Sequence, residues 1–297
     1  MPRFFKWPYA NMVISCDRPA HFDPPDGVLR MKMARLGDIS VHYRVDGPDD
    51  GPPVVFANSL GTDMRLWDPI LPLLPSGLRI IRYDKRGHGL TSCPPGRYAM
   101  GALVKDAENL LDHLQVTNCV FVGLSIGGMI AQGLAVKRLD LMRAMVLSNT
   151  AAKIGTPELW DARIADVESG GIEKLADAVM ERWFSAPFRA QPELALWRNM
   201  LTRQEANGYI GCSAAISGTD FFTPTSGLRL PTLGIAGSED GSTPPDLVRE
   251  TTDLIPGSQF HLIRKAGHLP CVEQPEEFAR VLTGFLQQVG HTAGPDG

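Results

Sequence analysis

The chain has 297 residues, of which 43% are hydrophobic and 21% charged, a balance typical of a globular protein with a large apolar core. The formal net charge is −4 and no basic block is present, which argues against a nucleic-acid partner. No apolar run approaches the ~20 residues that cross a bilayer, so the sequence excludes an integral membrane protein and a membrane partner.

The two ends of the chain are expected to lie outside the folded unit. Pro8 and Asn11 interrupt the only apolar stretch near the start, which argues against a signal peptide. We expect residues 1–30 to form a flexible arm, or to be sequence upstream of the true start, and residues 291–297 to form a frayed tail. The five cysteines include no Cys-x-x-Cys pair, which favours reduced thiols in a cytoplasmic protein.

Seven short runs rich in β-branched and apolar residues predict strands. The first run alternates apolar and polar residues, as an edge strand does, whereas the others are apolar throughout, as in strands buried on both faces of a parallel sheet. In chain order they span residues 39–45, 54–57, 79–83, 119–122, 145–147, 232–236 and 260–263. Helical patterns lie between them, at 103–114, 127–137, 245–254 and 275–289. This alternation predicts an α/β fold with a mostly parallel sheet.

The stretch from about residue 153 to residue 226 interrupts the alternation. It contains no convincing strand but several helical patterns, including residues 171–183 and 193–200. A helical insertion between two strands of an α/β sheet lies over the strand ends where ligands bind. We therefore expect residues 153–226 to form a helical cap over a core built from residues 31–152 and 227–290.

Gly123, Ser125 and Gly127 form a Gly-x-Ser-x-Gly motif between a strand-like run and a helical pattern. A serine in so tight a turn has an exposed hydroxyl at a helix N-terminus, where the helix dipole favours developing negative charge. The motif also occurs by chance in loops, but this context predicts a catalytic nucleophile.

A serine nucleophile needs a histidine base and an acid that orients the base. Asp240 and His268 each follow a predicted strand, as Ser125 does, so the three side chains could meet at one edge of the sheet. Glu239 is the alternative acid. The remaining histidines lie in predicted strands, in a helix or near the ends, or precede Ser125, as His88 does. The sequence therefore predicts a triad of Ser125, His268 and Asp240.

An oxyanion hole requires two backbone N–H donors directed at the developing charge. Ile126, which follows the nucleophile, is expected to supply one of them. The loop at residues 58–62 is expected to supply the other, with Leu60 as the best candidate. An ordinary glycine turn is the alternative interpretation of that loop.

From about residue 33 to residue 288 the chain resembles the α/β-hydrolase family, through these motifs and through Asp84-x-Arg-Gly-His-Gly89, which we interpret as shaping a loop. Within the family it is similar to the 3-oxoadipate enol-lactonases at residues 58–68, 148–155, 208–216, 237–245 and 267–273. Most α/β hydrolases have His-Gly where this chain has Asn58-Ser59. The resemblance implies a mostly parallel central sheet flanked by helices, with the helical cap inserted after the sixth strand.

The resemblance also implies an activity: a serine hydrolase that opens 3-oxoadipate enol-lactone to 3-oxoadipate through an acyl-enzyme, in the β-ketoadipate pathway of aromatic catabolism. It implies no metal or organic cofactor. The alternatives are a carboxylesterase, a lactonase of other specificity, and a non-catalytic receptor that only binds a ligand.

The implied substrate carries a free carboxylate, so its pocket is expected to contain a cation or strong hydrogen-bond donors. Lys153, at the junction of sheet and cap, is the first candidate, and Trp160 and Ser59 are further expected substrate contacts. The weaker candidates are the cap arginines Arg163, Arg182, Arg189, Arg198 and Arg203. A solvent-exposed surface position is the alternative for each basic residue, and helical packing is the alternative for Trp160.

Overall fold

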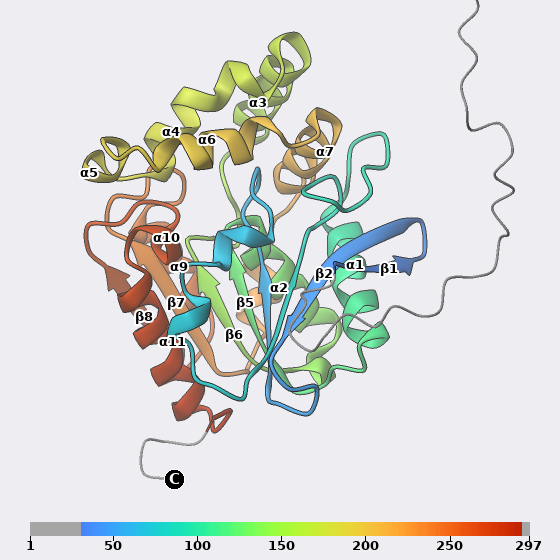
Figure 1. Ribbon diagram of the computed structural model, residues 1–297, viewed down its shortest axis with the longest axis vertical. Helices are drawn as coiled ribbons and strands as arrows, with labels where there is room; N and C mark the ends of the chain where they lie inside the picture. The colour runs from blue at the N-terminus through green and yellow to red at the C-terminus, as the bar shows by residue number, and fades with distance from the viewer. Residues whose placement is uncertain (1–30, 293–297) are drawn as a thin grey trace, which may run out of the picture. The chain divides into compact units, whose positions relative to one another are not determined.

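The computed structural model describes residues 31–292, so the expected arm (1–30) and the last five residues of the expected tail (293–297) lie outside the described residues. The strands are β1 (Lys32–Leu36), β2 (Ile39–Asp46), β3 (Pro53–Ala57), β4 (Arg79–Tyr83), β5 (Cys119–Leu124), β6 (Met142–Ser148), β7 (Thr232–Gly237) and β8 (Gln259–Ile263). They form one eight-stranded sheet in the order β1-β2-β4-β3-β5-β6-β7-β8 (Figure 1). β2 pairs antiparallel with β1 and with β4, and the other neighbours pair parallel.

All seven predicted strands are present, which confirms the predicted mostly parallel sheet. The prediction did not include β1, a five-residue strand in which only Ala34 and Leu36 are buried. Because Lys32, Met33 and Arg35 are exposed, the segment carries a weak apolar signal, and its pairing with β2 makes it a strand.

Helices flank the sheet and also fill the insertion after β6. The α-helices of the core are α1 (Met100–His113), α2 (Ile126–Lys137), α9 (Pro245–Asp253), α10 (Pro270–Glu273) and α11 (Pro275–Gln288). The insertion contains α3 (Pro157–Gly170), α4 (Ala176–Trp183), α5 (Ala186–Arg189), α6 (Leu194–Thr202), α7 (Ala206–Ser217) and α8 (Phe222–Ser226). Short 3-10 helices lie at Met64–Trp67, Leu71–Leu73, Leu139–Leu141 and Ile172–Leu175. In Figure 1, α3, α4, α6 and α7 lie together above the sheet, as expected of a helical cap.

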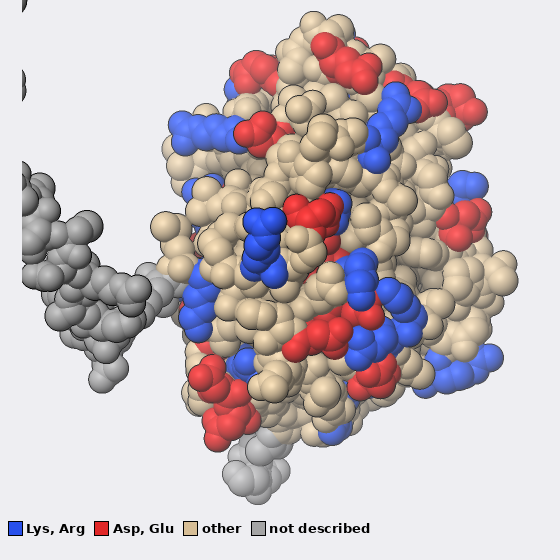
Figure 2. All heavy atoms as spheres, turned by 90° about the vertical axis from the view of Figure 1, so that its right-hand side faces the viewer, with Lys and Arg blue, Asp and Glu red and all other residues tan. Residues whose placement is uncertain are grey.

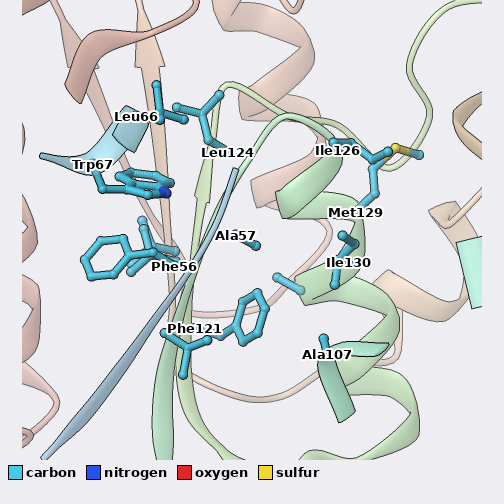
Figure 3. Packing of buried hydrophobic residues seen from close by; sticks show 14 of the residues in the cluster. Phe56, Ala57, Leu66, Trp67, Ala107, Phe121, Leu124, Ile126, Met129 and Ile130 are labelled. Atoms are coloured by element: carbon cyan, nitrogen blue, oxygen red, sulfur yellow. The ribbon is translucent and has the colours of Figure 1, made fainter. Parts of the chain in front are cut away.

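The core is densest around the central strands β3 and β5. Phe56 and Phe121 are fully buried there; in Figure 3 Phe56 lies on the side of Trp67, and Ile126 and Met129 at the start of α2 lie on the other side of the strands. Trp67 packs against Phe56 with ring centroids 4.8 Å apart. This packing holds the ends of β3 and β5 in place, and with them the loops that follow these two strands.

Cap and core meet at two glycines, Gly208 on α7 and Gly87 in the loop after β4. A Cβ atom on Gly208 would lie 2.0 Å from the Gly87 carbonyl oxygen and 2.4 Å from the Gly87 Cα. Since both contacts are with backbone atoms, no side-chain rotation could relieve them. The two segments therefore pack this closely only because both residues lack side chains.

Gly208→Ala should lower the free energy of unfolding by about 3 kcal/mol, because α7 has to move away from the core. Urea unfolding of the full chain measures this effect. Gly218→Ala, just beyond the end of α7, is the matched control: its Cβ would find its nearest neighbour at 3.6 Å, so we expect a change within about 0.5 kcal/mol. Equal effects of the two substitutions would contradict the close-contact argument.

The face of the molecule in Figure 2 carries Lys and Arg side chains next to Asp and Glu, without a broad field of one sign. Because the formal net charge is −4, attraction of an anionic ligand has to come from local cations. Within residues 31–292, no helix is long and apolar enough to cross a membrane. The four cysteines in this part of the chain, Cys93, Cys119, Cys212 and Cys271, are free.

Candidate active site

Ser125 occupies the turn between β5 and α2 in a conformation that is rare for a residue with a side chain. Its backbone angles are φ 58° and ψ −120°, and such a strained residue persists only where its surroundings enforce it. A Cβ on Gly123 would lie 2.2 Å from the Gly127 carbonyl oxygen, and a Cβ on Gly127 would lie 2.1 Å from the Ala57 carbonyl oxygen. The turn can therefore form beneath Ser125 only because both of these positions are glycines.

Asp240 and His268 come together at the ends of β7 and β8. The Nδ1 atom of His268 donates to Asp240 Oδ2 at 2.9 Å, and both side chains are buried. This bond leaves Nε2 as the ring nitrogen that can accept a proton. The alternative acid, Glu239, is exposed to solvent.

Several donors hold the Asp240 carboxylate in its ionised form. Oδ1 accepts the backbone N–H groups of Ser242 at 2.7 Å and Thr243 at 3.0 Å, and Oδ2 accepts the Asn149 amide and the Thr243 hydroxyl, each at 2.8 Å. Burial alone would raise the pKa of Asp240, but the charge of His268 and these hydrogen bonds outweigh it and lower the pKa below its usual value.

Asn149 is a site residue that the sequence reasoning did not assign. It directly follows β6 with φ 47°, and its amide also donates to the Gly267 carbonyl oxygen, next to His268. Asparagine is enriched at positive φ, so an Asn directly after a predicted strand was a usable signal. Its side chain joins the loops that carry the acid and the base.

Ser125 and His268 open into one cavity of about 420 Å³ under the cap. Its lining includes Ser59, Trp160 and Trp183. The Nε2 atom of His268 lies 3.4 Å from the Ser59 hydroxyl, and among the described hydrogen bonds none joins it to Ser125. Ser59 therefore lies next to His268 at the wall of the cavity.

The backbone amides of Leu60 and Ile126 are available as donors. Leu60 lines the cavity, and Ile126 is the first residue of α2, directly after Ser125. In the described part of the chain, neither N–H group has a hydrogen-bond acceptor. Both residues are buried, so an unpaired amide at either position is costly unless a ligand oxygen binds it.

The structure brings two of the three expected substrate contacts to the cavity, Ser59 and Trp160, and leaves Lys153 outside it. Lys153 is exposed, and its ammonium lies 3.3 Å from an Asp220 carboxylate oxygen. The physical reason is that Lys153 lies between the buried residues Ala152 and Ile154, so its side chain points away from the interior and extends to solvent.

Three basic residues of the cap line the cavity: Arg163 of α3, Lys174 of the 3-10 helix Ile172–Leu175, and Arg182 of α4. Lys174 is paired with Asp166 at 2.7 Å. Within residues 31–292, neither Arg163 nor Arg182 has an ion-pair partner. Two arginines that line the cavity are therefore not paired with a carboxylate in this part of the chain.

The end of α4 is bonded to both loops that carry the acid and the base. The Trp183 carbonyl oxygen accepts the N–H of His268 at 2.8 Å, and the Arg182 carbonyl oxygen accepts the N–H of Gly241 at 3.1 Å. The cap therefore positions the residues beside Ser125 in addition to covering them.

Comparison with known proteins identifies the family. The model of the alpha/beta hydrolase family matches residues 54–281. The chain belongs to the alpha/beta hydrolase family. It is 32% identical over 253 residues to 3-oxoadipate enol-lactonase 2 of Acinetobacter baylyi, an alignment that covers 84% of this chain and 94% of that protein.

Two solved structures are similar to this alpha/beta hydrolase over almost their whole length. The enol-lactonase from Burkholderia xenovorans has a TM-score of 0.83 at 34% identity and covers 86% of this chain and 100% of its own. A thermophilic esterase from Thermogutta terrifontis, solved with malate bound, has a TM-score of 0.81 at 29% identity and covers 89% of this chain and 100% of its own.

In this alpha/beta hydrolase, the Asp84-x-Arg-Gly-His-Gly89 segment shapes the loops beside the site. Asp84 accepts the backbone N–H of Met64 at 2.8 Å and that of Leu90 at 3.0 Å. The Nε2 atom of His88 accepts the N–H of Gly61 at 3.0 Å, and burial lowers the pKa of His88 well below its usual value. We therefore interpret His88 as a neutral hydrogen-bond acceptor for the loop after β3, and not as a second base.

Proposed function

We propose that this alpha/beta hydrolase opens 3-oxoadipate enol-lactone to 3-oxoadipate by acyl transfer. The observation that carries the proposal is that Ser125 and His268 share their cavity with two half-buried arginines, Arg163 and Arg182, which have no ion-pair partner within residues 31–292. An ester hydrolase for neutral substrates has no need of positive charge in its cavity, whereas a cation favours the binding of a lactone with a free carboxylate. The similarity to two enol-lactonases supports the same substrate.

The charges of the two arginines point to an anion between cap and core. Burial lowers the pKa of Arg182, and the nearby charge of Arg163 lowers it further. The Arg163 guanidinium also lies over the Trp160 ring, 5.0 Å from its centroid. Two like charges in one cavity repel each other, and a bound carboxylate would remove that repulsion while forming hydrogen bonds with planar, well-oriented donors.

The proposed acylation step uses the groups around Ser125. His268 takes the Ser125 hydroxyl proton on Nε2 while the oxygen attacks the lactone carbonyl, and Asp240 stabilises the imidazolium that forms. The N–H groups of Leu60 and Ile126 bind the oxyanion. Collapse of the tetrahedral intermediate breaks the ring C–O bond and expels an enolate, which takes the proton from Nε2 of His268 and becomes the ketone.

The proposed deacylation step returns the enzyme to its starting state. Water, deprotonated by Nε2 of His268, attacks the acyl-enzyme carbonyl, and the same N–H groups bind the second oxyanion. The ester bond to Ser125 breaks, the serine oxygen regains its proton from His268, and the dicarboxylic keto acid leaves. Neither step requires a metal or an organic cofactor.

A pair of substrates tests the proposal: the enol-lactone with its free carboxylate, and the methyl ester of that carboxylate, which is neutral. Arg182→Met and Arg163→Met should each lower kcat/KM for the anionic lactone by about 10- to 100-fold, mainly through KM, because each removes one charged hydrogen-bond partner. For the neutral ester we expect changes below about 3-fold. Initial rates with both substrates give the two ratios.

Arg189→Met is the matched control, since Arg189 is an exposed cap arginine outside the cavity. It should leave both rates unchanged. Equal losses for the two substrates in the cavity variants would contradict carboxylate recognition by the arginines. A wild-type protein that cleaves simple esters but not the enol-lactone would instead identify a carboxylesterase or a lactonase of other specificity.

A further inference from the structure

Lys85 is a buried cation that the proposed mechanism does not use. It follows β4, only 3% of its surface is exposed, and it lies beneath the loop at residues 58–62. Its Nζ atom donates to the Ser59 carbonyl oxygen at 2.6 Å and to the Thr62 carbonyl oxygen at 3.2 Å. A buried ammonium group therefore binds two backbone oxygens of the loop beside Ser125.

The first of these contacts acts on one peptide unit. The Ser59 carbonyl and the Leu60 N–H belong to the same peptide plane, and in a trans peptide these two groups point in opposite directions. The described residues contain no cis peptide bond. Lys85 shares the Ser59 carbonyl oxygen with the Thr62 hydroxyl, which donates to it at 2.9 Å. The N–H of Leu60 faces the other side, where Leu60 lines the cavity and the amide has no acceptor in residues 31–292.

The other anchors of this loop are neutral. His88 accepts the Gly61 N–H, and the Asn58 amide donates to the Tyr83 carbonyl oxygen at 3.0 Å and accepts from the Trp67 indole at 2.8 Å. These bonds fix the position of the loop. Among the described groups that hold it, Lys85 is the one whose charge acts on the Ser59–Leu60 peptide.

Lys85 is charged at a cost that its surroundings offset only in part. No carboxylate within residues 31–292 lies at ion-pair distance from Nζ. Burial lowers the pKa of Lys85 to about 8, while Cys212, Asp84 and Asp63 are the nearby groups that raise it. Burial raises the pKa of Cys212 to about 12, so that thiol is neutral. An isolated buried charge is expensive, and a neutral side chain would have satisfied the carbonyls more cheaply.

We propose that Lys85 is a positioning residue for the oxyanion hole: its ammonium orients and polarises the Ser59–Leu60 peptide, so that the N–H of Leu60 binds the developing oxyanion more strongly. A cation at the carbonyl end of a peptide draws electron density away from the N–H end, and the buried site screens this effect little. The inference rests on acyl transfer at Ser125 and not on the identity of the lactone.

The test compares an activated aryl ester with its thionoester, in which sulfur replaces the carbonyl oxygen. Sulfur is a weak hydrogen-bond acceptor, so the thionoester gains little from an oxyanion hole. Lys85→Met should lower kcat for the oxoester by about 10- to 100-fold, a smaller loss than complete removal of an oxyanion donor, with KM within about 3-fold. The thionoester rate should change by less than about 3-fold, so the oxoester-to-thionoester ratio falls.

The oxoester-to-thionoester ratio stays informative if part of the variant protein misfolds, because a smaller folded fraction lowers both rates by the same factor. Lys85→Gln, which can donate to the Ser59 carbonyl without charge, should give a ratio between those of wild type and Lys85→Met. Lys105→Met, an exposed lysine on α1, is the control and should leave the ratio unchanged. An unchanged ratio in Lys85→Met would overturn the proposal. Since simple esters are used, that result is independent of whether the enol-lactone is the substrate.

Discussion

Ser125→Ala should lower kcat for ester and lactone hydrolysis by about 10⁵-fold or more, because the substitution removes the nucleophile while the oxyanion donors remain. The fold should be retained, since alanine and serine experience the same backbone strain at φ 58°. Steady-state rates give the loss of activity, and covalent labelling by a fluorophosphonate probe, absent from the variant, identifies the nucleophile. Circular dichroism during thermal unfolding checks the fold.

Ser59 has to be tested beside Ser125, because its hydroxyl also lies near the proposed base, 3.4 Å from Nε2 of His268. Ser59→Ala should keep fluorophosphonate labelling and lose less than about 100-fold in kcat, since only a contact to substrate or base is removed. Labelling that survives in Ser125→Ala but disappears in Ser59→Ala would reverse the assignment. Ser169→Ala, an exposed serine of the cap, should behave as wild type.

Asp240→Asn should lower kcat by about 10⁴-fold, although the side chain keeps its size. The carboxylate accepts the Nδ1–H of His268, whereas an amide nitrogen at that position would donate and favour the tautomer with the proton on Nε2. In that tautomer Nε2 cannot take the proton of Ser125. The dependence of kcat on pH, measured together with the absolute rate, reports the loss of the base.

Glu239→Gln is the control for Asp240→Asn, because the two acids are adjacent in the chain and Glu239 is exposed. We expect a change below about 3-fold. If the two substitutions had effects of similar size, the orientation of His268 by Asp240 would not explain the loss. An activity higher in Asp240→Asn than in Glu239→Gln would assign the acid to Glu239.

The fold and the meeting of Ser125, Asp240 and His268 could be predicted because each signal is local. A strand followed by a tight turn places its next residues at one edge of a parallel sheet, whatever the rest of the chain does. The side chain of Lys153 could not be placed in this way. Its position in the chain is next to the sheet edge, but the direction of its side chain depends on how the chain enters α3, a tertiary property.

The roles of Asn149 and Lys85 were hidden for a different reason. Both act through contacts with loops far away in the sequence: Asn149 with Asp240 and Gly267, and Lys85 with Ser59. A single sequence shows a residue type but not its distant partner. Arg182 is an intermediate case. Its position in a cap helix was predicted from the sequence, but its place in the lining of the cavity was not.

The two hydrogen bonds from the end of α4 to His268 and Gly241 also bear on how substrate enters and how the enzyme could be re-engineered. A cap that swung away as a hinged lid would pull on the acid and base loops and disturb the triad with every turnover. We therefore expect this anchor to stay in place while substrate enters. Exchange of the cap for one of another specificity should keep residues 182–183 and vary α3 and α7.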